Sequence, residues 1–247
     1  MLGIPEAIEG CLFDLDGVLT QTAKLHDAAW KQTFDEFLRT WAARAGRPFR
    51  PFDAVDDYDR YVDGRPRLDG VRTFLASRGI ELPPGHADDA PGAETIVGLG
   101  AAKDAIVMRM ARENGVEAYE GSVRYVRAVR EAGLRRAVVS ASAHCREFLA
   151  AAGIAELFEV VVDGNDRLRE QLQGKPAPDT FLFAARELDI EPVRAAVFED
   201  ALAGVEAGRA GGFGYVVGVD RVGQAEELRA HGADRVVSDL AELLEAG

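Results

Sequence analysis

The chain has 247 residues, of which 47% are hydrophobic and 29% are charged, a composition typical of a globular protein with a sizeable core. The formal net charge of −13 argues against a nucleic-acid or anionic-membrane surface, because both require clustered positive charge. No apolar run approaches the roughly 20 residues of a membrane span, and the first residues show no signal-peptide pattern. We therefore expect a cytoplasmic protein that binds neither nucleic acid nor membrane and whose two cysteines stay reduced.

The first predicted element is a short buried strand that ends in two carboxylates. The apolar residues 11–13 are followed by Asp14 and Asp16, and Gly17 comes directly after them. An apolar run of this kind is typical of a strand in a parallel sheet, and open α/β sheets bind ligands at the carboxyl ends of their strands. By itself the stretch fits either a catalytic pair or an ordinary Asp-Gly turn.

The next hundred residues predict helices joined by loops. An apolar stripe at three- and four-residue spacing predicts a helix over residues 22–44, and His26 lies one turn into it as a weak functional candidate. Residues 46–100 are rich in Pro, Asp and Gly and predict a helix at 71–78 and a flexible excursion from 81 to 100. Lys103 opens another predicted helix, which runs to about residue 114.

A charged loop lies within this region. It contains Gly64, Arg65, Pro66 and Arg67, so a stiffened backbone presents two guanidinium groups. Such a loop binds a phosphate through paired hydrogen bonds, or it is a solvated charged loop with no ligand. The spacing alone leaves both interpretations open.

From residue 116 onward strands and helices alternate, which predicts a doubly wound parallel sheet. The predicted strands cover residues 134–139, 158–162, 195–198, 215–219 and 235–237, and the predicted helices between them include 122–132, 143–152, 178–188 and 201–210. The helical stretch interrupts this alternation after the first strand. We therefore expect an α/β, Rossmann-like core formed by residues 1–21 and 113–247, with an inserted, mainly α-helical domain at 22–112.

Polar residues suited to one task follow several predicted strands. Asp14 and Asp16 follow the first strand, Ser140 the second, and Glu199 and Asp200 a later one. The carboxyl ends of parallel strands share one edge of the sheet, so these groups can meet there. Four carboxylates would repel one another unless a cation joined them, and an all-oxygen site suits Mg²⁺. Lys175 would supply positive charge for a phosphate, and the Ser140 hydroxyl can donate to it.

In this order, the motifs resemble those of the haloacid dehalogenase-like superfamily. The β-phosphoglucomutase-like branch is the closer resemblance, and it covers nearly the whole chain. It rests on residues 13–22 with His26, on Ser140-Ala-Ser142, on Gly174-Lys-Pro-Ala-Pro-Asp179 and on Phe198-Glu-Asp-Ala-Leu-Ala-Gly204. The chain departs from the bacterial mutases at Asp63-Gly64-Arg65-Pro66-Arg67, where they have Lys-Gly-Val-Ser-Arg, and at Ala143-His144, where they have Lys-Asn.

The resemblance implies a role for each matching residue. Asp14 would be the nucleophile that takes the phosphoryl group, and Asp16 the general acid and base. Mg²⁺ would be held by Asp14, the backbone carbonyl of Asp16, Glu199 and Asp200. Ser140, Ser142 and Lys175 would grip the transferring phosphoryl group. In the inserted cap, the Gly64–Arg67 loop would bind the second phosphate of the sugar, Thr22 and His26 would couple cap closure to the placement of Asp16, and Lys103 would line the cap face.

The same resemblance predicts a monomeric enzyme that converts β-glucose 1-phosphate to glucose 6-phosphate through glucose 1,6-bisphosphate. Two alternatives remain open. In a phosphatase, water rather than a sugar hydroxyl attacks the aspartyl-phosphate, and the core motifs serve both reactions. A non-catalytic sugar-phosphate sensor is the third possibility, although a sensor has no need of a nucleophile and an acid together.

Overall fold

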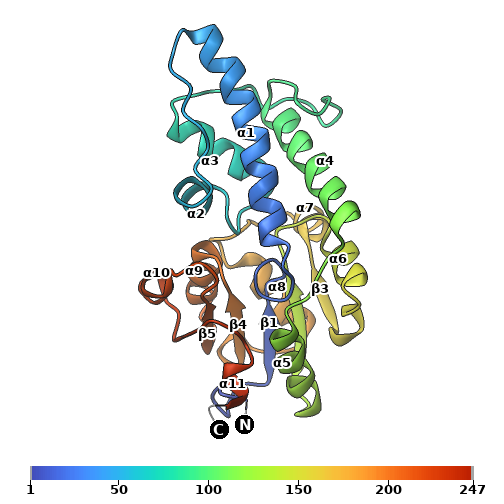
Figure 1. Cartoon of the computed structure of the whole chain (residues 1–247). Coiled ribbons are helices and arrows are strands. Elements are labelled where there is room, and N and C mark those ends of the chain that lie inside the picture. The colour runs from blue at the N-terminus through green and yellow to red at the C-terminus, as the bar shows by residue number, and fades with distance from the viewer. Residues whose placement is uncertain (1, 246–247) are drawn as a thin grey trace. The chain divides into compact units, whose positions relative to one another are not determined.

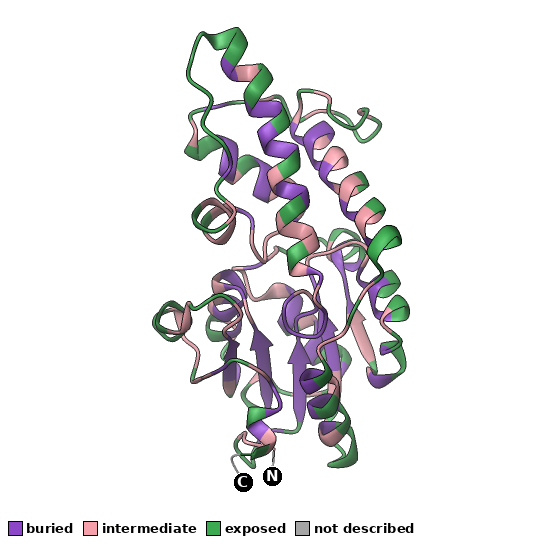
Figure 2. Cartoon of the chain, in the orientation of Figure 1, coloured by how far each residue is buried: buried purple, intermediate pink, exposed green. Residues whose placement is uncertain are grey.

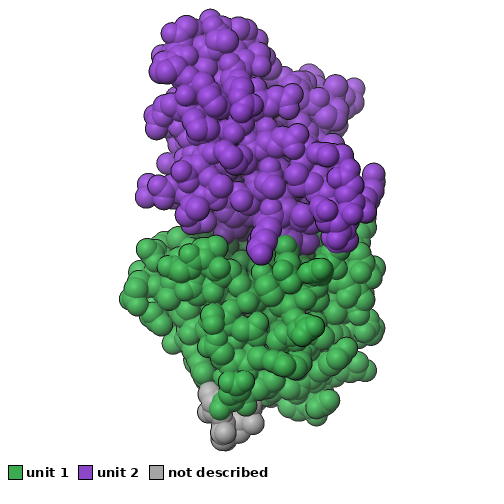
Figure 3. Space-filling view, viewed as in Figure 1, with its two compact units in different colours: residues 1–21, 116–247 green, residues 22–115 purple. Residues whose placement is uncertain are grey.

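The computed structural model describes residues 2–245, and they separate into two compact units. The first unit contains residues up to 21 and from 116 onward, and the second contains residues 22–115 (Figure 3). Each unit has its own apolar core. None of the helices within residues 2–245 is long and apolar enough to span a membrane.

The first unit is built on a parallel sheet of six strands in the order β3-β2-β1-β4-β5-β6. Its strands are β1 (Gly10–Phe13), β2 (Arg135–Val139), β3 (Val160–Val162), β4 (Ala195–Glu199), β5 (Tyr215–Val219) and β6 (Arg235–Val237). The central strands β1 and β4 are buried over their whole length (Figure 2). This explains why their residues up to Phe13 and Phe198 do not alternate between apolar and polar.

Helices lie on both sides of this sheet (Figure 1). They are α5 (Glu120–Glu131), α6 (Cys145–Ala151), α7 (Gly164–Arg169), α8 (Asp179–Glu187), α9 (Leu202–Ala210), α10 (Ala225–His231) and α11 (Glu242–Glu245), with 3₁₀ turns at Ala155–Leu157 and Pro192–Arg194. Successive strand residues face opposite ways. Leu12 accordingly packs in the cluster that contains Phe181 of α8, whereas the Phe13 ring meets Tyr125 of α5 with 6.3 Å between centroids. The predicted doubly wound α/β sheet is confirmed.

The second unit consists of four helices around an aromatic core. They are α1 (Ala23–Ala45), α2 (Asp56–Tyr61), α3 (Arg67–Ser77) and α4 (Ile96–Asn114). Phe34 of α1 lies at the centre of this core, and its ring centroid is 4.1 Å from that of Phe74 and 5.0 Å from that of Trp30. The apolar stripe predicted along residues 22–44 therefore packs in the core of the second unit.

Two of the predicted helices begin earlier in the structure. Helix α4 starts at Ile96 rather than near Lys103, because the Thr95 hydroxyl caps it by accepting from the Gly98 N–H at 2.9 Å. Gly98 lies in the first turn of this helix, and a side chain does not fit there, since a Cβ would lie 2.4 Å from the Ala93 carbonyl oxygen. Helix α3 begins at Arg67, four residues before the predicted start, directly after Pro66.

The excursion before α4 is anchored to that helix, contrary to the flexible loop expected from its composition. The Ile96 and Val97 N–H groups donate to the carbonyls of Pro83 and Pro84 at 3.0 and 3.1 Å. The Asp89 carboxylate also accepts from the Thr95 hydroxyl at 2.6 Å. Its last residues, 96–100, form the first turn of α4 itself.

Helices α2 and α7 were not predicted, because six-residue helices give too short a pattern for periodicity to detect. Helix α7 does carry a local signal. Asp163 and Asp166 form a capping box, in which each side chain accepts from the other residue's backbone N–H.

Candidate active site

Three adjacent strands bring the predicted core residues to one edge of the sheet. Asp14 follows β1, Ser140 follows β2, and Glu199 is the last residue of β4. Strand β1 lies between the other two, and neighbouring strands are about 4.8 Å apart. The backbone holds these ends in register, since the N–H groups of Asp14 and Ser140 donate to the Phe198 and Val162 carbonyls, each at 2.9 Å.

Lys175 occupies the centre of this edge. Its buried ammonium donates to Asp14 Oδ1 at 2.5 Å and to the Val139 carbonyl at 3.0 Å, and it lies 2.5 Å from Glu199 Oε1. Burial opposes the charged form of Lys175, but the two carboxylates hold its pKa above the usual value. The side chain is therefore a fixed positive charge beside Asp14.

An acidic cluster surrounds this lysine. Asp14, Glu199 and Asp200 each offer a carboxylate oxygen, and the three oxygens lie within 4.8 Å of one another. Burial raises the pKa of Asp14 well above its usual value; Lys175 opposes this rise, and the neighbouring Glu199 adds to it. Carboxylates gathered in this way are stabilised by a hard cation, which prefers oxygen ligands.

Two glycines leave space for the carboxylates of the cluster, because a side chain at either position would overlap with one of them. A Cβ at Gly17 would lie 1.6 Å from Asp200 Oδ2, and one at Gly204 would lie 1.9 Å from the Glu199 carboxyl carbon. Gly17 also has a φ of +80°, which L side chains rarely adopt. The residues present thus fit a bound divalent cation. The sequence pointed to Gly17 as a turn residue, but the role of Gly204 was missed because it depends on a contact between α9 and β4.

The remaining core residues border the same edge. Asp16 is half-buried in the turn after β1, where the Gly17 N–H donates to the Thr20 carbonyl at 2.9 Å. The Ser140 hydroxyl oxygen accepts from the Ser142 N–H at 3.1 Å, which leaves its own hydrogen for another acceptor. The Ser142 hydroxyl oxygen accepts from the His144 N–H at 3.2 Å and so shapes the loop after β2.

A loop that sequence analysis did not single out supports both carboxylate segments. After β5, Arg221 Nε donates to the Gly17 carbonyl at 2.7 Å, and its guanidinium lies 3.6 Å from the Tyr119 ring centre. Gln224 Nε2 donates to the Asp200 carbonyl at 3.0 Å. The β5–α10 loop therefore positions the backbone on both sides of the acidic cluster. No sequence motif marks it, because its role arises from a contact across 204 residues.

The predicted cap residues lie in the second unit. His26 Nδ1 of α1 is 2.5 Å from Lys103 Nζ of α4, and that ammonium is 5.1 Å from the Trp30 ring centre. Thr22 is buried at the N-terminus of α1. The pairing of His26 with Lys103 joins two candidates that lie 77 residues apart. Their roles toward a substrate stay predictions.

The arginine loop ends as the first turn of α3. Arg67 is the first residue of that helix and forms an ion pair with Asp104 of α4. Gly64 has a φ of +66° in the turn between α2 and α3. Asp104 thus orients the guanidinium that the sequence assigned to a sugar phosphate, and that assignment stays a prediction.

Comparisons with known proteins agree with this geometry. The model of the haloacid dehalogenase-like hydrolase family matches residues 8–212. A protein of Mycobacterium bovis named beta-phosphoglucomutase is 54% identical over 247 residues, which is 99% of this chain and 94% of that protein. Hexitol phosphatase A of Escherichia coli is 26% identical and covers 95% of this chain and 93% of its own length.

A solved structure shares the fold. The crystal structure of a beta-phosphoglucomutase from Clostridium difficile is 25% identical, with a TM-score of 0.71 over 96% of this chain and 93% of that one. The family match covers more than half of the chain, and the relative at 54% identity spans almost all of it. The chain therefore belongs to the haloacid dehalogenase-like hydrolase family.

Proposed function

We propose that this chain is a Mg²⁺-dependent phosphomutase that converts β-glucose 1-phosphate to glucose 6-phosphate through glucose 1,6-bisphosphate. The single observation that carries the choice of reaction is the 54% identity, over 99% of the chain, to a protein named beta-phosphoglucomutase. The lysine and acidic cluster at the sheet edge support the same class of chemistry, since phosphoryl transfer needs chiefly positioning and charge neutralisation.

Asp14 is the proposed nucleophile. Its carboxylate attacks the phosphorus of one phosphate, the bond from phosphorus to the sugar oxygen breaks, and an aspartyl-phosphate forms. This divides one difficult transfer into two easier ones. Lys175 favours the ionised carboxylate that the attack requires, because its ammonium donates to Asp14 Oδ1.

Asp16 is the proposed acid and base. It protonates the sugar oxygen that leaves, and it then takes the proton of the hydroxyl that attacks the aspartyl-phosphate. A carboxylic acid can do this only when its pKa approaches the working pH, which a site that excludes water favours.

The ion that fits the acidic cluster is proposed to be Mg²⁺. Its ligands would be Asp14, Glu199 and Asp200 with the backbone carbonyl of Asp16, and it would neutralise charge on the phosphoryl oxygens. Ser140 and Lys175 would bind those oxygens from the protein side, and Ser142 would hold the loop that presents Ser140.

The second unit is the proposed cap. Arg67 and the turn at Gly64 would bind the phosphate that is not transferred, which a bisphosphate intermediate requires in both of its orientations. Thr22 and His26 would couple cap closure to the placement of Asp16, and Lys103 would line the cap face of the site. The first unit would be the catalytic core, and the chain would act as a cytoplasmic monomer.

A phosphatase is the second candidate, and one observation favours it. Hexitol phosphatase A of Escherichia coli matches 95% of the chain, so the same architecture also supports hydrolysis. The two reactions share every core residue and differ only in whether water or a sugar hydroxyl accepts the phosphoryl group.

The decisive experiment incubates the protein with Mg²⁺, β-glucose 1-phosphate and a trace of glucose 1,6-bisphosphate, and follows the products by ³¹P NMR. Glucose 6-phosphate formed without inorganic phosphate supports the phosphomutase. Stoichiometric release of inorganic phosphate would instead identify a phosphatase. No turnover of either kind would point to the sensor.

A further inference from the structure

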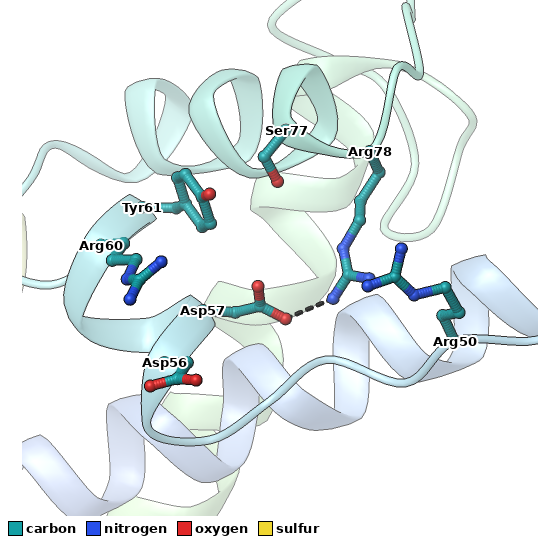
Figure 4. Close-up of a pocket in the computed structure, with 7 residues that line it drawn as sticks. All are labelled: Arg50, Asp56, Asp57, Arg60, Tyr61, Ser77 and Arg78. Carbon is teal, nitrogen blue, oxygen red and sulfur yellow. Dashed lines mark hydrogen bonds and ion pairs between the residues drawn. The ribbon is translucent and has the colours of Figure 1, made fainter.

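The second unit contains a pocket of about 230 Å³ whose lining is rich in arginine. It lies between α2, the segment before α2 and the C-terminal end of α3 (Figure 4). Its lining residues are Arg50, Asp56, Asp57, Arg60, Tyr61, Ser77 and Arg78. None of these residues belongs to the motifs assigned to phosphoryl transfer.

Arg78 is a fixed wall of this pocket. It forms an ion pair with Asp57, donates to the Pro51 carbonyl at 3.2 Å, and lies 5.2 Å from the Phe74 ring centre. Its side chain is only 12% exposed. Arg78 and Asp57 carry opposite charges, so together they add no net charge to the lining.

Arg50 and Arg60 supply positive charge that no ion pair within the lining balances. Both are exposed residues that line the pocket, and neither has a carboxylate partner within residues 2–245. Asp56 lies at the lower rim in Figure 4. Three guanidinium groups and two carboxylates therefore line the pocket, and the lining is net positive. This is notable in a chain with a formal net charge of −13.

The lining also offers a neutral donor. Tyr61 reaches the pocket from the end of α2, and its hydroxyl can donate to an anion. The Ser77 hydroxyl already donates to the Phe74 carbonyl at 2.6 Å, so it can only accept. The free donors are therefore two guanidinium groups and one phenol.

We propose that this pocket is a second binding site, for the phosphoryl dianion of inorganic phosphate or of a small phosphomonoester. A guanidinium group binds phosphate through charge-assisted hydrogen bonds, and Figure 4 shows Arg60 on one side of the pocket and Arg50, beside Arg78, on the other. The volume is below the 300–1,000 Å³ range of ordinary small-molecule pockets, which excludes a nucleotide but accommodates a phosphate with a short organic part.

This site is distinct from the sugar-phosphate contact assigned to Arg67. Arg67 is the first residue of α3, whereas Ser77 is the last and Arg78 follows it. At 1.5 Å per residue the two ends of α3 are about 15 Å apart. The proposal also does not rest on the phosphomutase assignment, because no lining residue takes part in that reaction.

The test is a titration of the ¹⁵N-labelled protein with inorganic phosphate and, separately, with glucose 6-phosphate at constant ionic strength. We expect saturable shifts of the amide signals of Asp57, Tyr61 and Arg78. The Ser140 amide reports separately on the active site. Equal affinity for both ligands would identify the phosphoryl group itself as the ligand, and tighter binding of the ester would identify a phosphomonoester.

Charge-removing variants then test the arginines. Arg50→Gln and Arg60→Gln should each weaken binding about tenfold or more, because each loses charge-assisted hydrogen bonds. Both side chains are unpaired, so the melting temperature should not change. Arg112→Gln, at an exposed position of α4 on the same unit, removes the same charge and should bind normally. Absence of saturable shifts, or affinity unchanged in Arg60→Gln, would overturn the proposal.

Discussion

At the scale of single residues, the candidate site contains buried charges that balance one another. Lys175 lies 2.5 Å from an oxygen of both Asp14 and Glu199, and all three side chains are buried. Breaking such a cluster by removing one partner is costly, whereas an isosteric change at one carboxylate keeps the packing. Substitutions that alter charge but not shape therefore report best on function.

The first prediction concerns Asp14, the proposed nucleophile. Asp14→Asn keeps the side-chain shape but removes the attacking oxygen charge, so turnover should fall by about four orders of magnitude or more. The far-ultraviolet circular dichroism should be unchanged, and ³²P from labelled substrate should no longer attach to the protein. Turnover retained at the wild-type rate would refute the assignment of Asp14.

The second prediction concerns the loop after β5. Gln224→Ala removes the donor to the Asp200 carbonyl, so the Mg²⁺ concentration for half-maximal activity should rise about tenfold. Gln173→Ala, at an exposed site, is the matched control and should leave the Mg²⁺ dependence unchanged. An unchanged Mg²⁺ requirement in Gln224→Ala would show that this loop does not support the metal site.

At the scale of elements, end contacts decide where helices begin. The Thr95 hydroxyl fixes the start of α4, and the capping box of Asp163 and Asp166 fixes the start of α7. Arg146 of α6 adds to the second cap, with one nitrogen 2.8 Å from Asp166 Oδ2. Such contacts matter most for short helices, whose intrinsic stability is low.

The third prediction is a pH dependence at this cap. Burial alone would raise the pKa of Asp166, but the Asp163 N–H and Arg146 lower it below its usual value. The ionised form therefore stabilises the folded state above the unfolded pKa, and this contribution is lost as the pH falls through the folded pKa. Asp166→Asn should cost about 1 kcal/mol at pH 7, and the difference should shrink below about pH 4.

Urea unfolding at several pH values measures this effect. Asp88→Asn at an exposed site is the control and should leave the free energy of unfolding unchanged at every pH. A difference between the wild type and Asp166→Asn that stays constant down to pH 2 would contradict the role of the ionised carboxylate.

At the scale of the whole molecule, the chain forms two hydrophobic cores, one rich in aromatic residues and the other mainly aliphatic. The aromatic cluster around Phe34 serves residues 22–115, whereas the aliphatic cluster around Leu12 and Phe181 serves the sheet. A domain inserted after the first strand can keep its own core because residues 22–115 are one continuous segment and the aromatic cluster lies within it. Stability is then expected to differ between the units.

The fourth prediction tests this independence. Phe34→Ala deletes a fully buried ring and should lower the stability of the second unit by about 3–5 kcal/mol. Amide hydrogen exchange should quicken in α1 and α3 while β1 and β4 keep their protection. Phe181→Ala, in the core of the first unit, should give the reverse pattern. Equal loss of protection in both units for either variant would show a single cooperative core.

The sequence by itself determined the alternating α/β core, the residues at its strand ends and the family. These features depend on local patterns: a continuous apolar strand, a carboxylate pair after it, and short motifs whose order along the chain mirrors the order of strand ends. The side chains of Asp14 and Glu199 come together because parallel strands share one edge, and Lys175 reaches the same edge from the loop before α8.

Only the tertiary structure decided which residues support that edge and where a further ligand can bind. Arg221 and Gln224 contact the backbone at Gly17 and Asp200, which are distant in sequence, and Gly204 matters because the Glu199 carboxylate fills the space beside it. The arginine pocket combines residues from a loop and two helices, one of them too short to predict. Such contacts follow from packing between elements, which no local pattern in the sequence encodes.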